Sequence, residues 1–93
     1  MKNMFMIIGR IVELPEEIEI VDTGIKQMEL KIKILENINE STEVVVRLPK
    51  QLVNNIKEYA TVNDLIGVKG FIGNKNVLFA EKVTFLAGSC KKD

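Results

Sequence analysis

Residues Gln27–Ile34, with the sequence QMELKIKI, alternate polar and apolar side chains without interruption. In a β-strand successive side chains point to opposite faces, so this order places every apolar residue of the stretch on one face. A helix would distribute the same residues around its axis, because its side chains repeat about every 3.6 residues. The stretch therefore predicts a strand that is buried on one side and exposed to solvent on the other.

The segment upstream is expected to form another strand that pairs with this one. Met4–Leu14 is mostly apolar and β-branched, with Gly9 in its interior. A glycine inside a strand often marks a bulge or a sharp bend, which a sheet needs in order to close into a barrel. Ile18, Ile20 and the turn residues DTG at 22–24 lead into the alternating stretch. This whole region predicts a hairpin or a meander.

Downstream, a third strand and a helix are expected. The polar stretch 36–42 predicts a turn, and Glu43–Leu48 alternates again, which predicts a strand. Pro49 is suited to the first position of a helix, because the helix needs no N–H from that residue. One face of this helix of about ten residues carries Leu52, Ile56 and Tyr59.

The remaining residues predict one more hairpin. After a connection that ends at Asn63 and Asp64, Leu65–Ile72 is again typical of a strand, and its glycines favour tight curvature. Residues GNKN at 73–76 predict a compact turn, and Val77–Leu86 predicts the last strand.

This order of elements indicates the fold class. Three strands, one short helix and two further strands are the order of the all-β, five-stranded Greek-key barrel known as the OB-fold, with its helix between strands three and four. A chain of 93 residues has room for one such domain. We expect the domain to span residues 1–87 and residues 88–93 to form a short C-terminal tail.

The charge of the chain is balanced overall but unevenly distributed. Thirteen basic and thirteen acidic side chains cancel, whereas a nucleic-acid-binding domain is usually basic. Residues 1–40 hold eight acids against five bases, and residues 41–93 hold eight bases against five acids. The second half of the chain is therefore the part that favours a polyanionic partner.

The sequence favours a cytoplasmic protein without a membrane partner. The N-terminal apolar run is short and is soon followed by Arg10 and Glu13, which excludes a signal peptide or a membrane span there. The single cysteine, Cys90, cannot form an internal disulfide, which favours a reducing compartment. So small a domain would gain stability from self-association, because more apolar surface is buried.

No motif predicts catalysis, a cofactor or a metal site. The chain has no histidine, which is the usual acid–base and metal-binding residue near neutral pH. Cys90 lies in the expected tail without a histidine partner, and the glycines do not form a phosphate-binding loop. Glu16, Glu17, Glu19 and Asp22 are expected to be a solvated acidic segment rather than a cation site.

Four groups of residues carry a resemblance that covers most of the chain. They are Asn3 with IIGRI at 7–11, Pro15 and Glu16; Gly24 with Ile25 and LKI at 30–32; Asn55, Ile56 and Tyr59 with LIGVKG at 65–70; and AEKVTFL at 80–86. In this order they resemble the opening strand, the second strand, the helix with the fourth strand, and the final strand of the bacterial single-stranded-DNA-binding proteins. The resemblance implies an OB barrel that binds single-stranded DNA without sequence preference.

The chain also departs from that family. The family stacks bases on several tryptophans, whereas this chain has none and carries Arg47, Leu48 and Pro49 near one such position. The hairpin between the last two strands is short, and the family's acidic, partner-recruiting C-terminal tip is absent from a sequence that ends in Lys91, Lys92 and Asp93. Short, tail-less relatives of the primosomal replication protein N type are therefore the nearer comparison.

Single-stranded DNA is bound by a basic groove and by flat side chains on which bases stack. We expect six outward-facing residues to supply both: Lys31, Lys33, Arg47, Lys69, Phe71 and Lys75. The competing interpretation is that Lys31, Lys33 and Lys69 are solvated partners of Glu29 or Glu81, in pairs that contribute little. Of the other aromatic residues, Phe5 is expected in the core, and Phe79 and Phe85 in the core or a subunit interface. Tyr59 is expected to be structural.

Two functions remain open. The first is binding of single-stranded DNA, with RNA as a possible ligand, by a homodimer or homotetramer that acts in replication, recombination or mobile-element transfer. The second is a protein-interaction or assembly module that does not bind DNA, which the zero net charge and the absence of tryptophan favour.

Overall fold

The computed structural model of the chain describes residues 3–19, 26–35 and 40–88. All the expected strands and the expected helix are present in the expected order. They are β1 (Asn3–Glu19), β2 (Lys26–Leu35), β3 (Ser41–Leu48), α1 (Lys50–Tyr59), β4 (Leu65–Ile72) and β5 (Leu78–Ala87), with a short 3-10 turn, η1 (Asn74–Asn76), between the last two strands. The turn expected at 22–24 and residues 89–93 of the expected tail lie outside the described residues. Of the turn expected at 36–42, residues 41 and 42 belong to β3.

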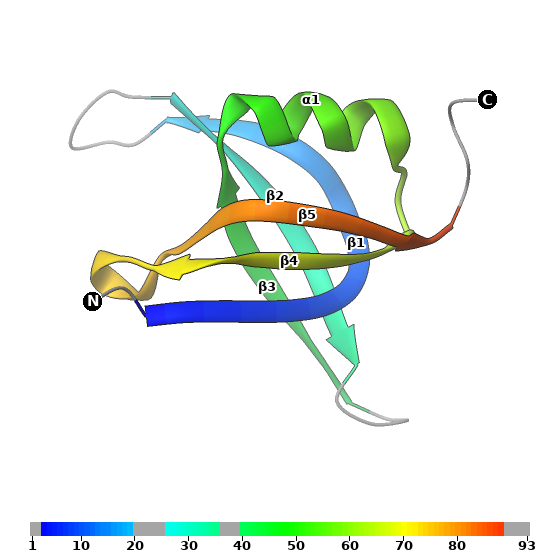
Figure 1. The fold of residues 1–93 in the computed structure, drawn as a ribbon, viewed down its shortest axis with the longest axis horizontal. Coiled ribbons are helices and arrows are strands. Elements are labelled where there is room, and N and C mark those ends of the chain that lie inside the picture. Colours follow the sequence, from blue (N-terminus) through cyan, green and yellow to red (C-terminus); the bar gives the residue numbers. More distant parts are fainter. Residues whose placement is uncertain (1–2, 20–25, 36–39, 89–93) are drawn as a thin grey trace.

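The strands close into a barrel in the order β1-β2-β3-β5-β4, as Figure 1 shows. Each neighbouring pair is antiparallel except β3 and β5, which run parallel and meet at Val46–Leu78 and Arg47–Phe79. The long strand β1 is shared, because Asn3–Arg10 pairs with β4 and Arg10–Glu19 pairs with β2. This architecture confirms the expected OB-type fold.

The bend predicted at Gly9 is the point where β1 passes from β4 to β2. A Cβ atom at this position would stand 2.6 Å from Ile32 Cγ2 and 2.6 Å from the carbonyl oxygen of Lys33. Such distances are too short for any side chain, so only glycine lets the two strands approach this closely. Further along β1, the pairing with β2 shifts register on both sides of Glu13, and Pro15 lies in the second shift, where a missing N–H costs no ladder hydrogen bond.

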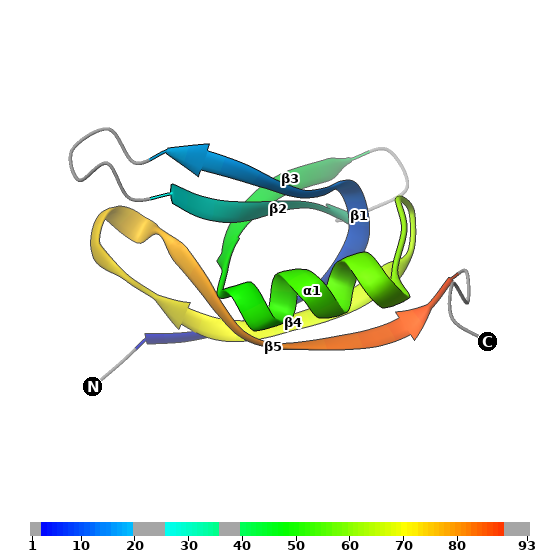
Figure 2. The same cartoon turned by 90° about the horizontal axis from the view of Figure 1, so that it is seen from above.

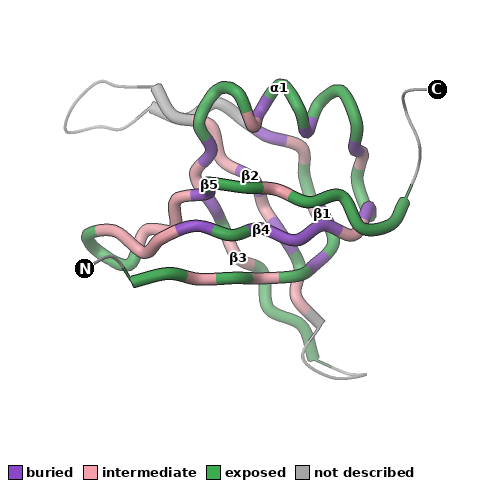
Figure 3. The backbone as a smooth tube through the Cα atoms, in the orientation of Figure 1, coloured by how far each residue is buried: buried purple, intermediate pink, exposed green. Residues whose placement is uncertain are grey.

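The core fills the barrel from the inward side of every strand, and α1 covers one end (Figure 2). Leu30 and Ile32 of β2 are fully buried, as the alternation of QMELKIKI predicts. From α1, Val53 and Ile56 enter the core, whereas Tyr59 at the end of the helix is 40% exposed. Figure 3 shows that burial alternates along the strands, with the most continuous buried stretch in β4. The expected core position of Phe5 is confirmed, because this ring packs against the buried cluster.

The pairing of β4 with β5 contains a bulge. Lys69 lies opposite Lys82, but the next residue, Gly70, lies opposite Ala80, so Glu81 has no partner in the ladder. One extra residue reverses which face each later side chain takes.

The bulge makes the expected core position of Phe79 wrong, whereas the alternative expectation, a subunit interface, stays a prediction. Counting alternate residues back from Val83 puts Phe79 on the inward side, but the bulge turns it outward, opposite Phe71. Phe85, on the other side of the bulge, lies opposite the buried Ile66 and is 41% exposed. Its ring lies 5.9 Å from that of Tyr59.

Candidate nucleic-acid interface

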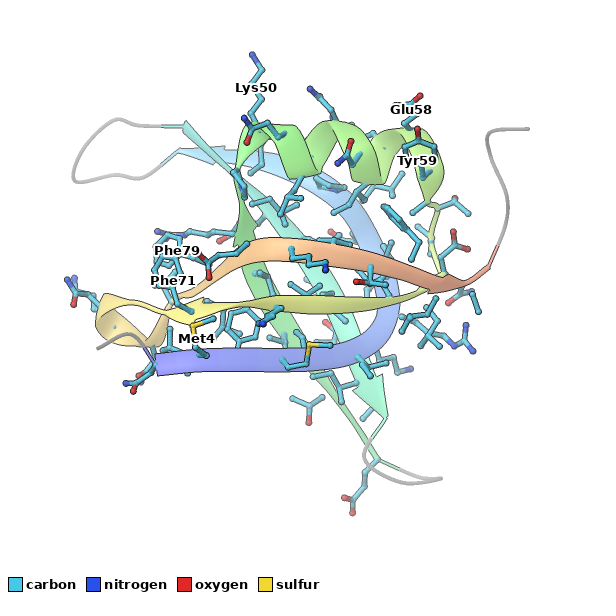
Figure 4. The ribbon with its side chains drawn as sticks, viewed as in Figure 1. Met4, Lys50, Glu58, Tyr59, Phe71 and Phe79 are labelled. Carbon is cyan, nitrogen blue, oxygen red and sulfur yellow. The ribbon has the colours of Figure 1, made fainter. Side chains whose placement is uncertain are left out.

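A single row of outward-facing residues crosses the barrel wall. Strand register places Glu29 of β2 opposite Arg47 of β3, Arg47 beside Phe79 of β5, Phe79 opposite Phe71 of β4, and Phe71 opposite Met4 of β1. Figure 4 shows Phe79, Phe71 and Met4 following one another across their three strands. We call these five residues the aromatic row. It contains Arg47 and Phe71, two of the residues that the sequence predicted.

Two aromatic rings form the centre of this row. The rings of Phe71 and Phe79 stack with their centroids 5.1 Å apart and their planes 15° from parallel. The Phe79 ring also lies against the hairpin backbone, since a Cβ atom on Gly73 would stand 2.6 Å from its Cε2 atom. Both rings are half-buried. The pair is therefore a fixed, partly exposed platform of the kind on which nucleobases stack.

Arg47 adds a cation beside the platform. Its Cζ atom lies 5.9 Å from the centroid of the Phe79 ring, at the outer limit of a cation–π contact. Its Nε atom lies 3.8 Å from Oε2 of Glu29, close enough for charge attraction but too far for a hydrogen bond. In the part of the chain that the structure describes, Arg47 Nε is the one buried side-chain polar atom without a hydrogen bond.

A hollow of about 270 Å³ opens beside this cation and the two rings. Its lining is Arg47, Leu48, Pro49, Phe71, Phe79 and Ala80. A cation and two flat apolar rings around one hollow suit a ligand that carries both a negative charge and a planar base.

Lys31 lies in the neighbouring outward row, two residues along β2 from Glu29. Its Nζ atom is 3.6 Å from Oε1 of Glu13 on β1, and 36% of its side chain is exposed. A hollow of about 230 Å³ lies here, lined by Glu13, Leu14, Glu29, Lys31 and Val45. Lys31 and Arg47 are therefore close neighbours across β2 and β3, and each has a carboxylate beside it.

Lys33 lies apart from the aromatic row. It is opposite Arg10 on one side and Glu43 on the other, in a separate hollow of about 320 Å³ that Val62 and Asn63 also line. The Nη1 atom of Arg10 donates a hydrogen bond of 2.9 Å to the backbone oxygen of Asn63. The structure therefore does not bring Lys33 together with Phe71, as a single converging face would require.

Lys69 on β4 and Lys75 in η1 belong to elements that do not pair with β2, the strand of Lys33. Lys69 faces outward on β4, directly opposite Lys82 of β5, and neither lysine has an ion-pair partner among the described residues. Two like charges directly opposite each other on a sheet repel. Lys75 is exposed in η1, where its φ of 60° belongs to the tight turn of the hairpin.

The outer wall thus has two parts with different surfaces. The charge-balanced face, on β1, β2 and β3, consists of Glu13, Glu29, Lys31, Lys33, Glu43 and Arg47. The lysine–apolar face, on β1, β4 and β5, consists of Met4, Met6, Ile8, Lys69, Lys82 and Leu86. The aromatic row joins the two faces.

The apolar residues of the second face are strongly exposed. Met6 is 62% exposed, and Leu86 is 47% exposed. They approach each other above Gly67, where a Cβ atom would meet Met6 Cε at 3.7 Å and Leu86 Cδ1 at 3.8 Å. An exposed apolar patch rimmed by charge is typical of an interaction surface.

Sequence reasoning missed Phe79 and Lys82 as residues of the outer wall. The signal for Phe79 would have been the bulge at Glu81, which the sequence does not mark with a glycine. The signal for Lys82 would have been the register of β4 with β5, which depends on residues far apart in the chain.

The described residues offer little else that suggests chemistry. No group of three or more histidine, cysteine, aspartate or glutamate residues lies close enough to hold a metal ion in these segments. Among the helices of the described part of the chain, none is long and apolar enough to cross a bilayer.

Comparisons with solved structures agree on the fold. The chain is similar to the mitochondrial single-stranded DNA binding protein Rim1 of S. cerevisiae, with a TM-score of 0.80 and 15% identity over 96% of this chain and 99% of that chain. The dimeric N-terminal domain of PriB from Thermoanaerobacter tencongensis matches with a TM-score of 0.71 and 12% identity, over 92% of this chain and 98% of that one.

A third similar structure is the second single-stranded DNA binding protein of Mycobacterium smegmatis. It matches with a TM-score of 0.67 and 15% identity over 99% of this chain and 100% of that chain. No protein-family model and no curated protein matched the sequence. At such low identity the likeness establishes a shared fold, that of the single-stranded DNA binding proteins and the PriB domain named above.

Proposed function

We propose that this protein binds single-stranded DNA without sequence preference and does not act as an enzyme. The observation that carries the proposal is the aromatic row, in which Arg47 lies beside Phe79 and Phe79 stacks on Phe71. Stacked rings contribute to binding any base, because every base has a π-face, and a guanidinium contributes to binding any phosphate. Neither contact reads a base edge, so neither favours a sequence.

The lysines around the row extend the proposed site on both sides. Lys31 lies beside Arg47, Lys75 lies in the hairpin next to the platform, and Lys69 with Lys82 lies beyond it on β4 and β5. Lys33 lies in a separate hollow, so only a longer single-stranded DNA that extends beyond the aromatic row would contact it. None of these residues would distinguish deoxyribose from ribose, so the proposal includes single-stranded RNA as a second ligand.

The proposal includes self-association as a homodimer or homotetramer. Residues Asn3–Gly9 of β1 pair with β4 on one side only, and no described strand pairs with their other edge. An unpaired edge next to the exposed Met6 and Ile8 is a surface that a second copy could cover. The proposed setting is cytoplasmic, in replication, recombination or the transfer of mobile DNA.

Titration of a fluorescent oligo-dT by the purified protein tests the proposal. We expect the Phe79→Ala and Phe71→Ala variants to bind about 5- to 150-fold more weakly, since base stacking on a ring is worth about 1–3 kcal/mol. Phe85→Ala is the matched control, because Phe85 is a half-exposed ring that lies outside the aromatic row. Equal affinities for all four proteins would exclude the aromatic row as the site.

The salt dependence of the same titration tests the role of the basic residues. Because this chain has no tryptophan and only 5% aromatic residues, binding should depend strongly on phosphate contacts. Affinity should therefore fall steeply between about 0.05 and about 0.3 M salt. The single changes Lys31→Ala and Lys69→Ala should each reduce that slope by about 0.7. Binding that does not change with salt would contradict the proposed phosphate contacts.

A second function is a protein-interaction module that does not bind DNA. Two observations favour it: Lys31 and Arg47 already lie beside carboxylates, and the lysine–apolar face exposes Met4, Met6 and Ile8. The two functions differ in one simple result. A wild-type protein that fails to bind oligo-dT even at about 0.05 M salt, where electrostatic binding is strong, would favour the second function.

A further inference from the structure

Carboxylates lie beside two cations in and next to the hollow between β1, β2 and β3, because Lys31 lines this hollow and Arg47 lines the neighbouring one. Glu13 and Glu29 both line it, together with Lys31, Leu14 and Val45. Glu13 Oε1 is 3.6 Å from Lys31 Nζ, and Glu29 Oε2 is 3.8 Å from Arg47 Nε. The anionic oxygens of the protein therefore lie beside the two cations that a DNA phosphate would contact at this place.

The contact between Glu29 and Arg47 attracts the guanidinium but does not satisfy it. At 3.8 Å the Nε–H donor makes no hydrogen bond, and this atom is buried from solvent. A buried donor without an acceptor costs about 1–3 kcal/mol. Arg47 is thus held over the Phe79 ring with unused donor capacity, in a pair that is only about three-quarters buried.

We propose that Glu29, with Glu13 beside it, is an intramolecular competitor of nucleic-acid phosphate. This inference rests on the proposed binding of single-stranded DNA at the aromatic row. In the free protein the carboxylate of Glu29 holds Arg47; in the complex a phosphate oxygen replaces the carboxylate at the guanidinium. The exchange weakens DNA binding for two reasons. The DNA must separate the existing ion pair of Glu29 with Arg47, and the carboxylate of Glu29 then remains close to the negative phosphate.

The first test is the Glu29→Gln variant, which removes the charge and keeps the size of the side chain. We expect it to bind oligo-dT about three- to tenfold more tightly than wild type at about 0.15 M salt. Glu13→Gln should give a smaller gain, because Glu13 is more exposed than Glu29.

Glu40→Gln is the matched control for the change in net charge. Glu40 is an exposed residue just before β3, and at about 3.3 Å per residue it lies roughly 20 Å from Arg47. That distance is well beyond the screening length of about 8 Å at physiological salt. We therefore expect less than about a twofold change in its affinity for oligo-dT.

A double-mutant cycle tests whether Glu29 acts through Arg47. In an Arg47→Gln background, the further change Glu29→Gln should not increase affinity, because the cation for which carboxylate and phosphate compete is absent. A nonspecific gain from the added positive charge would persist in that background. Circular dichroism of all four proteins confirms that each is folded.

Every outcome decides between the possibilities. If wild type binds through Arg47 but Glu29→Gln binds equally or less tightly, Glu29 orients Arg47 for DNA, and this inference alone is wrong. If the gain persists in the Arg47→Gln background, the inference is also wrong. If neither wild type nor Glu29→Gln binds oligo-dT at low salt, the proposed function fails and this inference fails with it.

Discussion

The two faces of the barrel wall differ in the neighbours of their cations. On the charge-balanced face, Lys31 and Arg47 each lie within 4 Å of a carboxylate from a neighbouring strand. On the lysine–apolar face, Lys69 lies opposite another lysine, Lys82, and beside the exposed Met6. On the first face opposite charges lie side by side, although Arg47 Nε still lacks a hydrogen bond. On the second face neither the repulsion between the two lysines nor the exposed apolar area is compensated.

This difference indicates different partners for the two faces. A surface of paired charges can bind a polyanion only by exchanging one ion pair for another. Its affinity for the polyanion is therefore weak and depends on how strongly the carboxylates compete. A surface of methionine, isoleucine and lysine gains from being covered by another protein. The aromatic row lies between them. Under the proposed function, DNA binds at this boundary and at the lysines on either side of it, and the apolar residues of the second face remain available for assembly.

The largest effect is expected where the two faces meet, at Gly70. A Cβ atom there would overlap the backbone carbonyl oxygen of Phe79, so the bulge that turns Phe79 outward would have to move. We expect Gly70→Ala to lower the free energy of unfolding by about 2–4 kcal/mol, measured by urea denaturation.

Gly67→Ala is the control for that change, because Gly67 lies on the same strand. Its Cβ would meet only ordinary contacts of 3.7 Å or more, so its free energy of unfolding should change by less than about 1 kcal/mol. Equal destabilisation of the two variants would mean that the bulge does not depend on the close approach at Gly70.

The second effect concerns assembly. If the lysine–apolar face binds a second copy, Met6→Glu should weaken self-association by about 1.5–3 kcal/mol, because it removes buried apolar area and introduces a charge. Sedimentation analysis would then show a smaller mean mass. Val45→Glu is the control on the charge-balanced face, where Val45 is 42% exposed, and its mass should equal that of wild type. A shift in Val45→Glu alone would reverse the assignment of the two faces.

The smallest effect concerns the charges themselves. Lys82→Glu would place a carboxylate opposite Lys69 and should stabilise the fold by about 0.2–0.5 kcal/mol. Lys31→Glu would place a second carboxylate beside Glu13 and should destabilise it by a similar amount. Thermal unfolding measures both, and about 1 M salt should remove both effects. Two changes of the same sign would contradict the contrast between the faces.

The sequence predicted those parts of the fold that depend on local pattern. Alternation in Gln27–Ile34 placed Leu30 and Ile32 inside and Lys31 and Lys33 outside, as the structure has them. The bend at Gly9 was equally predictable, because a glycine inside an apolar strand usually marks a bulge, a bend or a close approach of another backbone.

The candidate site was predictable only in part, because it depends on contacts between distant residues. Alternation cannot reveal that Glu81 is an extra residue, so counting from Val83 placed Phe79 on the wrong side. It also cannot show that Lys33 lies beside Arg10 while Lys31 lies next to the row of Arg47. The register between strands decides which residues lie next to Lys31 and which lie next to Lys33, and no single stretch of the sequence encodes that register.

The short contact between β3 and β5 links the site to the motion of the barrel. These strands meet in two residue pairs, against seven or eight at each other junction of the described strands. Local opening is easiest where the fewest interactions must break, so we expect the barrel to open first at the junction of β3 and β5. Arg47 lies on β3 and Phe79 on β5, so single-stranded DNA bound to both residues would bridge this junction and hold it closed. The residence time of bound single-stranded DNA would then depend on how often the junction between β3 and β5 opens.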